Sequence, residues 1–283
     1  MWHRTWGRGW LARGIDMATQ ALAKFSRIAL EFHPPAARLC LNNPPLNVID
    51  ITMMEELSQA LAEVETRDDV SLLVLSGAGK AFSVGVNVAD HTSDKIESML
   101  AKFHSVIRAV VSTKKVTIAA VHGHCLGGGA ELAMVCDLVY TSETASWGFP
   151  EIKLGCYPPV AATALAALVG QKHAADLIFT GRSITGQEAA DRGLANRALP
   201  DVEVEPAVHE SMQHLLKLSP AVLAITKKAT YVWDSMHFDK GLARAEKLYL
   251  EELMKTEDVR EGINAFLEKR QPVWKGNRVR SKK

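Results

Sequence analysis

The chain has 283 residues, of which 47% are hydrophobic and 23% are charged, and its formal net charge is +1. This composition is ordinary for a globular protein, and the length suits one large domain or one domain with an appendage. Nucleic-acid binding needs a surplus of basic groups, so a near-neutral chain gives no general reason to expect it. No apolar run reaches the roughly 20 residues of a membrane span, so we expect no association with a membrane.

The first sixteen residues differ in composition from the rest of the chain. Trp2, Trp6 and Trp10 recur there at helical spacing, among three arginines and a single acidic residue. An arginine-rich, acid-poor leader is typical of a transit peptide, whereas a translation start at Met17 would make these residues an extension. We favour the extension, and we set residues 1–22 apart from the fold as a leader.

Four cysteines are spread along the chain without a CxxC pair, at Cys40, Cys125, Cys136 and Cys156. Their neighbours are apolar or glycine-rich, which favours buried free thiols over disulfides or metal ligands. Free thiols suit a reducing compartment, so we expect a cytoplasmic protein, or a mitochondrial one if the leader is a transit peptide.

Strands and helices are predicted to alternate over the first part of the chain, which indicates an α/β architecture. The two proline residues Pro34 and Pro35 separate the first two strands and predict a short connection. In chain order, we expect strands over 28–32 and 37–41, a helix over 54–64, a strand over 70–75, a helix over 96–110, a strand over 116–121, a helix over 130–135 and a strand over 138–141.

The chain becomes mostly helical after Gly170, and no strand-like run follows between residues 202 and 270. Thr185 has a capping-box partner in Glu188, and Ser219 precedes a proline at a first helical position. We place a soft boundary near Pro200, between a core over 23–200 and a helical region over 201–283. We expect the helical region to pack on a neighbouring subunit.

A run of three glycines, residues 127–129, lies between an apolar strand and an apolar helix. Glycines there leave the first N–H groups of the helix accessible, and the helix dipole favours a negative oxygen beside them. A carboxylate, Glu131, follows the run, and a second one, Glu151, lies twenty positions later. An anion site beside carboxylates predicts chemistry on a carbonyl compound.

Three segments taken together resemble the crotonase superfamily of enoyl-CoA hydratases and isomerases. They are GKAFSxGxxV (79–88), HGxxLGGGxELAMxCD (122–137) and FPEIKLG (149–155), and the match continues over 184–199 and 260–270. The resemblance covers roughly residues 23–275. It implies a spiral of ββα units with a helical C-terminal region, an acyl-CoA substrate, and a homotrimer or a dimer of trimers. Coenzyme A is part of the substrate, and no separate cofactor, metal or nucleic acid is implied.

The resemblance also implies the catalytic residues. The backbone N–H groups of Val86 and Gly128 would hold the thioester oxygen as negative charge develops on it. Glu131 and Glu151 map onto the two glutamates of the hydratases, which share the proton transfers of water addition. Because both glutamates are present, the resemblance favours a hydratase over an isomerase.

Further substrate-binding residues are expected along the same segments. Trp147 is as compatible with a core position as with ring contact, and a lysine late in the chain is as compatible with a solvated helix face as with a phosphate. The expected contacts are Pro45 and Leu46 for the coenzyme, Val84, Gly85, Asn87 and Gly127 around the thioester, His91, Trp147, Pro158 and Pro159 at the acyl end, and Phe266 and Lys269 at the nucleotide of a neighbouring subunit.

The acyl group is predicted from two short stretches, residues 90–92 and 155–161. Both resemble cyclic dienoyl-CoA hydratases, which convert cyclohexa-1,5-diene-1-carbonyl-CoA to 6-hydroxycyclohex-1-ene-1-carbonyl-CoA. The alternatives are a short-chain enoyl-CoA hydratase, an enoyl-CoA isomerase and a non-catalytic module of the same fold that binds RNA. His122 and His124 have metal-ligand spacing but no third ligand nearby, so we expect turn or core positions for them.

Overall fold

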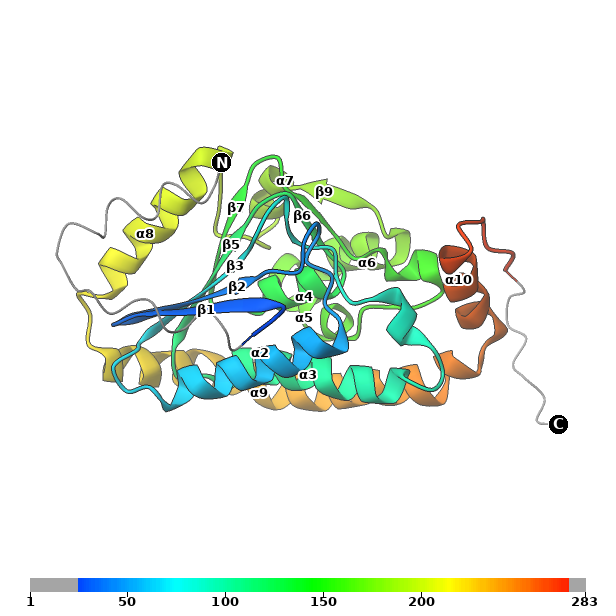
Figure 1. The fold of residues 1–283 in the computed structure, drawn as a ribbon, viewed down its shortest axis with the longest axis horizontal. Helices are drawn as coiled ribbons and strands as arrows, with labels where there is room; N and C mark the ends of the chain where they lie inside the picture. Colours follow the sequence, from blue (N-terminus) through cyan, green and yellow to red (C-terminus); the bar gives the residue numbers. More distant parts are fainter. Residues whose placement is uncertain (1–24, 275–283) are drawn as a thin grey trace.

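Two β-sheets form the centre of the fold in the computed structural model, which describes residues 25–274 except the side chains of residues 231–237 (Figure 1). The predicted leader and the basic chain end lie outside the described residues. The larger sheet has the order β1-β2-β3-β5-β7-β10 and the smaller one the order β4-β6-β8-β9. The strands of the larger sheet are β1 (Ile28–His33), β2 (Ala36–Leu41), β3 (Leu72–Gly77), β5 (Val116–Val121), β7 (Leu138–Ser142) and β10 (Arg197–Leu199).

In each successive pair of strands, one strand belongs to the larger sheet and the next belongs to the smaller sheet, so the chain forms a spiral. β3, β5 and β7 run parallel in the larger sheet, and each is followed by a short strand of the smaller sheet. A helix then completes each turn, so the expected ββα spiral is confirmed. The short strands were not predicted; they are β4 (Ala81–Ser83), β6 (His124–Leu126), β8 (Ser146–Gly148) and β9 (Ser183–Thr185).

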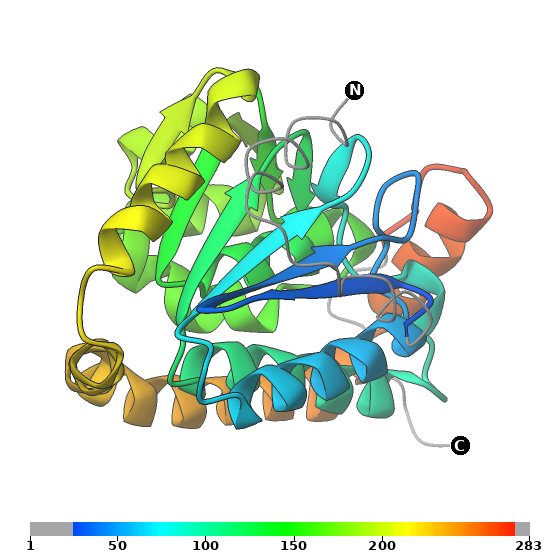
Figure 2. The same ribbon diagram turned by 60° about the vertical axis from the view of Figure 1, so that its left-hand side comes forward.

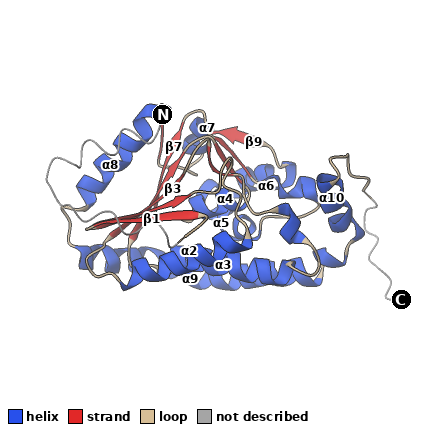
Figure 3. Cartoon of the chain, viewed as in Figure 1, coloured by secondary structure: helices blue, strands red, loops and turns tan. Residues whose placement is uncertain are grey.

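Helices cover both faces of the larger sheet, as Figures 2 and 3 show. One face packs on an apolar core shared with α2 (Ile51–Thr66) and α3 (Ile96–Ser112). The other face is covered by α8 (Val204–Leu215), whose buried residues form a smaller cluster with β3, β5 and β7. The predicted helices and main strands are confirmed, with ends shifted by a few residues.

The C-terminal helices pack along the core and towards one end of the molecule (Figure 1). α9 (Pro220–Glu251) is capped by Ser219 as predicted, and its Lys227 Nζ lies 2.8 Å from the carboxylate of Asp137. α10 (Glu257–Leu267) packs on the 3-10 turns η2 (Val88–His91) and η3 (Pro150–Leu154). No helix in the described part of the chain is long and apolar enough to cross a membrane.

Short helices fill the remaining turns of the spiral. α7 begins after Thr185, whose hydroxyl accepts from the Glu188 N–H (3.1 Å) as the capping box predicted. All four cysteines are free, as expected. The remaining helices are α4 (Gly128–Met134), α5 (Pro159–Val169), α6 (Gln171–Thr180), α7 (Gly186–Asp191) and the 3-10 turns η4 (Asp201–Glu203) and η5 (Leu253–Lys255).

Candidate active site

A cavity of about 80 Å³ lies where the segment after β4, the start of α4 and η3 meet. It brings together the three sequence segments that carry the crotonase resemblance, although they are far apart in the chain. Its lining residues are Val84, Gly85, Val86, Val88, His91, Met99, Leu100, Phe103, His104, Gly127, Gly128, Glu131, Pro150, Glu151, Leu154, Tyr157, Pro159 and Tyr249.

Two backbone N–H groups face this cavity from adjacent segments. The Ile49 N–H donates to Gly85 O (2.9 Å), and Ile49 O accepts from the Asn87 N–H (3.0 Å). In such a parallel bridge the peptide groups of the intervening Val86 point to the opposite side. The Gly128 N–H is the first of α4, where a helix has no acceptor one turn back. The two segments are in close contact, since a Cβ built on Gly128 would lie 3.4 Å from the Val86 nitrogen.

The loop that carries Val86 is fixed by the buried side chain of Asn47. The Asn47 amide nitrogen donates to Ala81 O (2.8 Å) and Ala78 O (2.9 Å). Ser83 Oγ donates to Asn47 O (2.7 Å) and accepts from the Gly85 N–H (3.0 Å). Asn47 therefore holds the donor loop in place, a positioning role that the sequence did not indicate.

Glu131 is buried on the first turn of α4, with 2% of its surface exposed. Its Oε1 accepts hydrogen bonds from the N–H groups of Val160 (2.8 Å) and Ala161 (2.9 Å), in the first turn of α5. Burial raises the pKa of Glu131 to about 7, and the two N–H donors oppose that rise because they stabilise the carboxylate. The carboxyl is thus held in one orientation and poised near neutral pH.

Glu151 approaches the same cavity from η3, where a hydrogen bond from its own backbone N–H favours the carboxylate only weakly against the effects of burial and charge. Burial and the negative charge of Glu131 raise the pKa of Glu151 well above its usual value. Its Oε2 is buried without a hydrogen-bond partner among the described residues. Its Oε1 lies so close to Gly127 that a Cβ there would be only 2.7 Å away. The site therefore pairs a hydrogen-bonded carboxylate with a carboxyl that favours its protonated form.

Several other predicted residues also line the cavity. His91 does so with its Nδ1 3.1 Å from Asn87 O, and burial lowers the pKa of His91, which favours a neutral ring. Pro159 begins α5 at the acyl end. The lining residues that had been predicted are Val84, Gly85, Val86, His91, Gly127, Gly128, Glu131, Glu151 and Pro159.

The structure corrects the expectation that Trp147 contacts the acyl group. Its ring is fully buried in the core, and its Nε1 donates to Thr141 Oγ1 (2.9 Å). The short strand β8, which sequence reasoning did not identify, turns the ring inward.

Four further predicted contacts do not line this cavity, although they lie in the segments that build it. Pro45 is exposed, and Leu46 O accepts from the Val84 N–H (3.1 Å). The Asn87 side chain caps η2, and Pro158 precedes α5. Coenzyme contacts of Pro45 and Leu46 remain predictions.

Phe266 and Lys269 lie at the far end of the chain, at and after the end of α10. Both side chains are exposed, and neither is among the residues that line the cavity. Their predicted partner is the coenzyme of a neighbouring subunit, so this contact stays a prediction. Within the chain itself, α10 supports the site by packing on η3, the segment that carries Glu151.

Sequence reasoning missed several residues of the cavity wall. Phe103 belongs to the apolar stripe of the predicted helix over 96–110, and nothing in the sequence set it apart from the rest of that stripe. His104 interrupts that stripe with a polar group, a signal that could have identified it. Tyr157 lies in the stretch 155–161 but was not singled out, and Tyr249 gave no local signal, since α9 approaches the cavity only through the tertiary fold.

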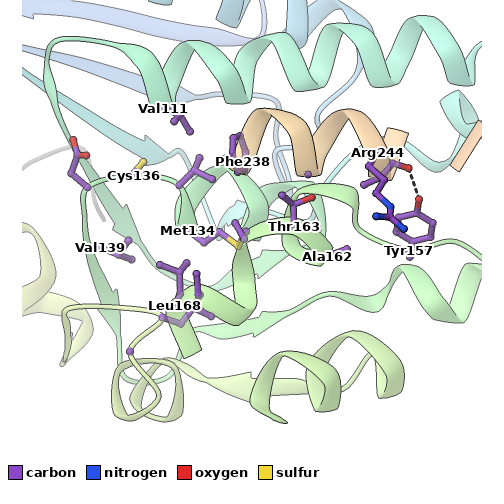
Figure 4. Close-up of a pocket in the computed structure, with 18 of the residues that line it drawn as sticks. Val111, Met134, Cys136, Val139, Tyr157, Ala162, Thr163, Leu168, Phe238 and Arg244 are labelled. Atoms are coloured by element: carbon purple, nitrogen blue, oxygen red, sulfur yellow. Dashed lines mark hydrogen bonds between the residues drawn. The ribbon is translucent and has the colours of Figure 1, made fainter. Parts of the chain in front are cut away.

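A larger cavity, of about 680 Å³, lies beside α5 and α9 (Figure 4). Tyr157 lines both cavities, and its hydroxyl donates to Ala245 O at 2.5 Å. The carboxylate of Asp137 at its wall is bound by Lys227 and by Thr117. Among the described residues that line the larger cavity, Asp137 is the one acidic residue, so the paired carboxyls lie in the smaller cavity.

Spiralling ββα turns that join two backbone donors to two buried carboxyls define a crotonase-type site. A family model described as enoyl-CoA hydratase/isomerase matches residues 35–277. The chain therefore belongs to the enoyl-CoA hydratase/isomerase family. Membership supports hydration of an enoyl-CoA thioester by a hydro-lyase.

Individual relatives agree with this assignment. The chain is 35% identical over 248 residues to a cyclohexa-1,5-dienecarbonyl-CoA hydratase of Thauera aromatica, covering 88% of this chain and 96% of the relative. It is 36% identical over 255 residues to a probable enoyl-CoA hydratase of Bacillus subtilis (strain 168), covering 88% and 98%. The crystal structure of an enoyl-CoA hydratase from Mycobacterium avium subsp. paratuberculosis K-10 has a TM-score of 0.80 at 25% identity, covering 89% of this chain and 99% of that one.

Proposed function

We propose that the protein adds water to cyclohexa-1,5-diene-1-carbonyl-CoA and forms 6-hydroxycyclohex-1-ene-1-carbonyl-CoA. The observation that carries the proposal is the pair of carboxyls in one cavity, that of the buried Glu131 and that of Glu151 with its buried Oε2, beside the Val86 and Gly128 N–H groups. Hydration needs one group to deprotonate water, another to supply a proton to carbon, and donors for the oxyanion. The cavity contains a candidate for each task.

The two glutamates differ in hydrogen bonding and in pKa, as expected for a general base and a general acid. Glu131 accepts two backbone hydrogen bonds that favour its ionised form, so we assign it as the base that deprotonates water. Glu151 has a strongly raised pKa, because it is buried and lies near the charge of Glu131, so we assign it as the acid.

In the proposed reaction the thioester oxygen accepts hydrogen bonds from the Val86 and Gly128 N–H groups. Water bonds to the β-carbon as its proton passes to Glu131, and the electrons of the double bond move towards the thioester as a dienolate. Glu151 then protonates the far carbon of the former diene, which leaves one ring double bond. Proton transfer from Glu131 to Glu151 restores the resting state.

Support for the cyclic substrate comes from the name of the Thauera aromatica relative and from the rigid Pro159 at the cavity wall. The second candidate is a short-chain enoyl-CoA hydratase, and the similar identity to the Bacillus subtilis relative favours it equally. An isomerase is less well supported because both glutamates are present.

Side-by-side hydration assays with the purified full chain test the substrate. We expect a higher kcat/KM for cyclohexa-1,5-diene-1-carbonyl-CoA than for crotonyl-CoA. A clear preference for crotonyl-CoA would replace the cyclic substrate by a short-chain one. Absence of any acyl-CoA binding in calorimetry, together with tight RNA binding, would support the non-catalytic module.

We further propose a homotrimer or a dimer of trimers located in the cytoplasm. Support for assembly comes from large apolar side chains exposed on α6 and α9, which include Phe179, Val222 and Ile225. Light scattering of the full chain at micromolar concentration should give the mass of three or six subunits, and a monomer would contradict the assembly.

A further inference from the structure

The catalytic cavity contains two polar groups that the proposed reaction does not use. His104 Nε2 and the Tyr249 hydroxyl are both buried without a hydrogen-bond partner among the residues that the structure describes. Both residues line the same cavity as Glu131 and Glu151. Buried polar groups without partners are uncommon and costly, so two in one ligand cavity indicate a polar group on the ligand.

His104 is held in one orientation by a carboxylate on another helix. The side chain lies on α3 with 0% of its surface exposed, and its Nδ1 is 2.6 Å from Glu246 Oε1 on α9. Arg108 Nη2 donates to the same oxygen at 3.1 Å. Because an ionised carboxylate only accepts, the proton of a neutral ring is placed on Nδ1. The Nε2 atom is then left as a hydrogen-bond acceptor.

Tyr249 provides the complementary group from the same helix as Glu246. The two residues are three positions apart on α9 and therefore lie on one face of it. The Tyr249 ring packs on Tyr157, with ring centres 5.2 Å apart. Its hydroxyl lies near the Cys156 thiol, a weak hydrogen-bonding group that itself contacts Leu154 O (3.7 Å). A phenol can donate to a ligand oxygen as well as accept from one.

The charges that act on His104 differ from the charge that acts on Glu151. The charges that act on the pKa of His104 are those of Glu246 and Arg108, while burial lowers that pKa. The charge that raises the pKa of Glu151 is that of Glu131.

We propose that His104 and Tyr249 are specificity-determining residues that favour acyl groups carrying a hydroxyl in addition to the reacting double bond. A hydroxyl can donate to His104 Nε2 and accept from the Tyr249 hydroxyl, whereas a carbonyl has no hydrogen to donate to the imidazole. With an all-carbon acyl group, a water molecule has to form the hydrogen bonds to both atoms. A hydroxyl on the ligand replaces that water molecule. The inference rests on the proposed enoyl-CoA hydratase activity and extends it to a substrate subclass.

Matched substrate pairs test this specificity in the full-length enzyme. One pair is but-2-enoyl-CoA and 4-hydroxybut-2-enoyl-CoA, and the other is hex-2-enoyl-CoA and 6-hydroxyhex-2-enoyl-CoA. A site built to bind a hydroxyl discriminates strongly against an analogue that lacks it. For at least one pair we expect kcat/KM to favour the hydroxylated member by about tenfold or more.

Three variants separate specificity from folding. His104→Phe and Tyr249→Phe should each reduce that preference by about tenfold, since each removes one polar partner. His173→Phe, on the exposed face of α6, is the matched control and should keep the wild-type ratio. The inference is overturned if the wild type shows no preference for either hydroxylated substrate, or if both variants keep it. Failure of the wild type to hydrate these four thioesters would also overturn the inference, and failure to hydrate cyclohexa-1,5-diene-1-carbonyl-CoA as well would refute the proposed function.

Discussion

Replacing Gly127 by alanine adds a single methyl group, which should lower catalytic activity in a protein that still folds. Its backbone has φ 52° and ψ −130°, a conformation that is open to glycine and strained for other residues. An alanine Cβ there would lie 2.7 Å from Glu151 Oε1. The atom it meets is the far end of a flexible side chain, so the contact is relieved by moving the carboxyl.

The expected magnitudes follow from these two features. Backbone strain of this kind costs on the order of 1–3 kcal/mol in stability. The Glu151 carboxyl has to move by several tenths of an ångström to reach the ordinary contact distance of 3.4 Å. Because a misplacement of about 1 Å can cost on the order of 100-fold in rate, we expect Gly127→Ala to lower kcat by about 10- to 100-fold.

Gly170→Ala is the matched control. Gly170 also has a glycine-type conformation, with φ 79° and ψ 153°, but no atom lies within 4 Å of its added Cβ. Thermal unfolding should show a similar loss of stability in both variants, while steady-state hydration should fall only in Gly127→Ala. Wild-type activity in Gly127→Ala, or an equal loss of activity in Gly170→Ala, would refute the reasoning.

Three further predictions concern stability. Glu131 binds a proton in the folded protein up to about pH 7, against an ordinary pKa of 4.5, so its contribution to the free energy of unfolding should fall by on the order of 3 kcal/mol as the pH rises between these values. Urea titrations should show a smaller fall in Glu131→Gln, in which the raised pKa of Glu151 still contributes a fall of the same sign. Gly262→Ala places a Cβ 2.2 Å from Leu154 O and should cost about 1–3 kcal/mol in thermal unfolding, with a lower kcat because η3 carries a catalytic carboxyl. Lys227→Met leaves the Asp137 carboxylate without its buried partner and should cost about 3 kcal/mol in urea unfolding.

Each of these variants has an exposed counterpart that should behave as the wild type. The counterparts are Glu143→Gln for the pH dependence, Asn264→Ala on α10 and Lys228→Met on α9. A pH dependence as large in Glu131→Gln as in the wild type would mean that Glu131 does not titrate over this range. If Gly262→Ala and Lys227→Met lose no more stability than their exposed counterparts, the packing at Gly262 and the ion pair of Lys227 contribute little to the free energy of unfolding.

The main strands and helices were predictable because the buried residues of each follow a recognisable pattern in the sequence. β5 is apolar throughout, and α3 has an apolar stripe at helical spacing. The four strands of the smaller sheet were not predictable, since each has three residues and no alternation can be read from so few. The misplaced expectation for Trp147 follows from missing β8.

The candidate site was predictable where sequence motifs carry it. Glu131 and Glu151 come from segments whose spacing resembles the family, and the cavity contains both. Their different environments could not be predicted, because the N–H groups that bind Glu131 belong to α5 and the neighbours of Glu151 are set by the fold. Residues that α9 contributes, such as Tyr249, lie well outside the three motifs, the last of which ends at residue 155.

The most direct test of the account is the effect of Glu131→Gln and Glu151→Gln on hydration of the best enoyl-CoA substrate. Both substitutions keep the size of the side chain and remove its ability to exchange a proton. We predict that each lowers kcat/KM by about 100-fold or more, while Glu143→Gln on the surface leaves it unchanged. Hydration by Glu151→Gln at the wild-type rate would contradict the assignment of this cavity as the active site of a two-glutamate hydratase.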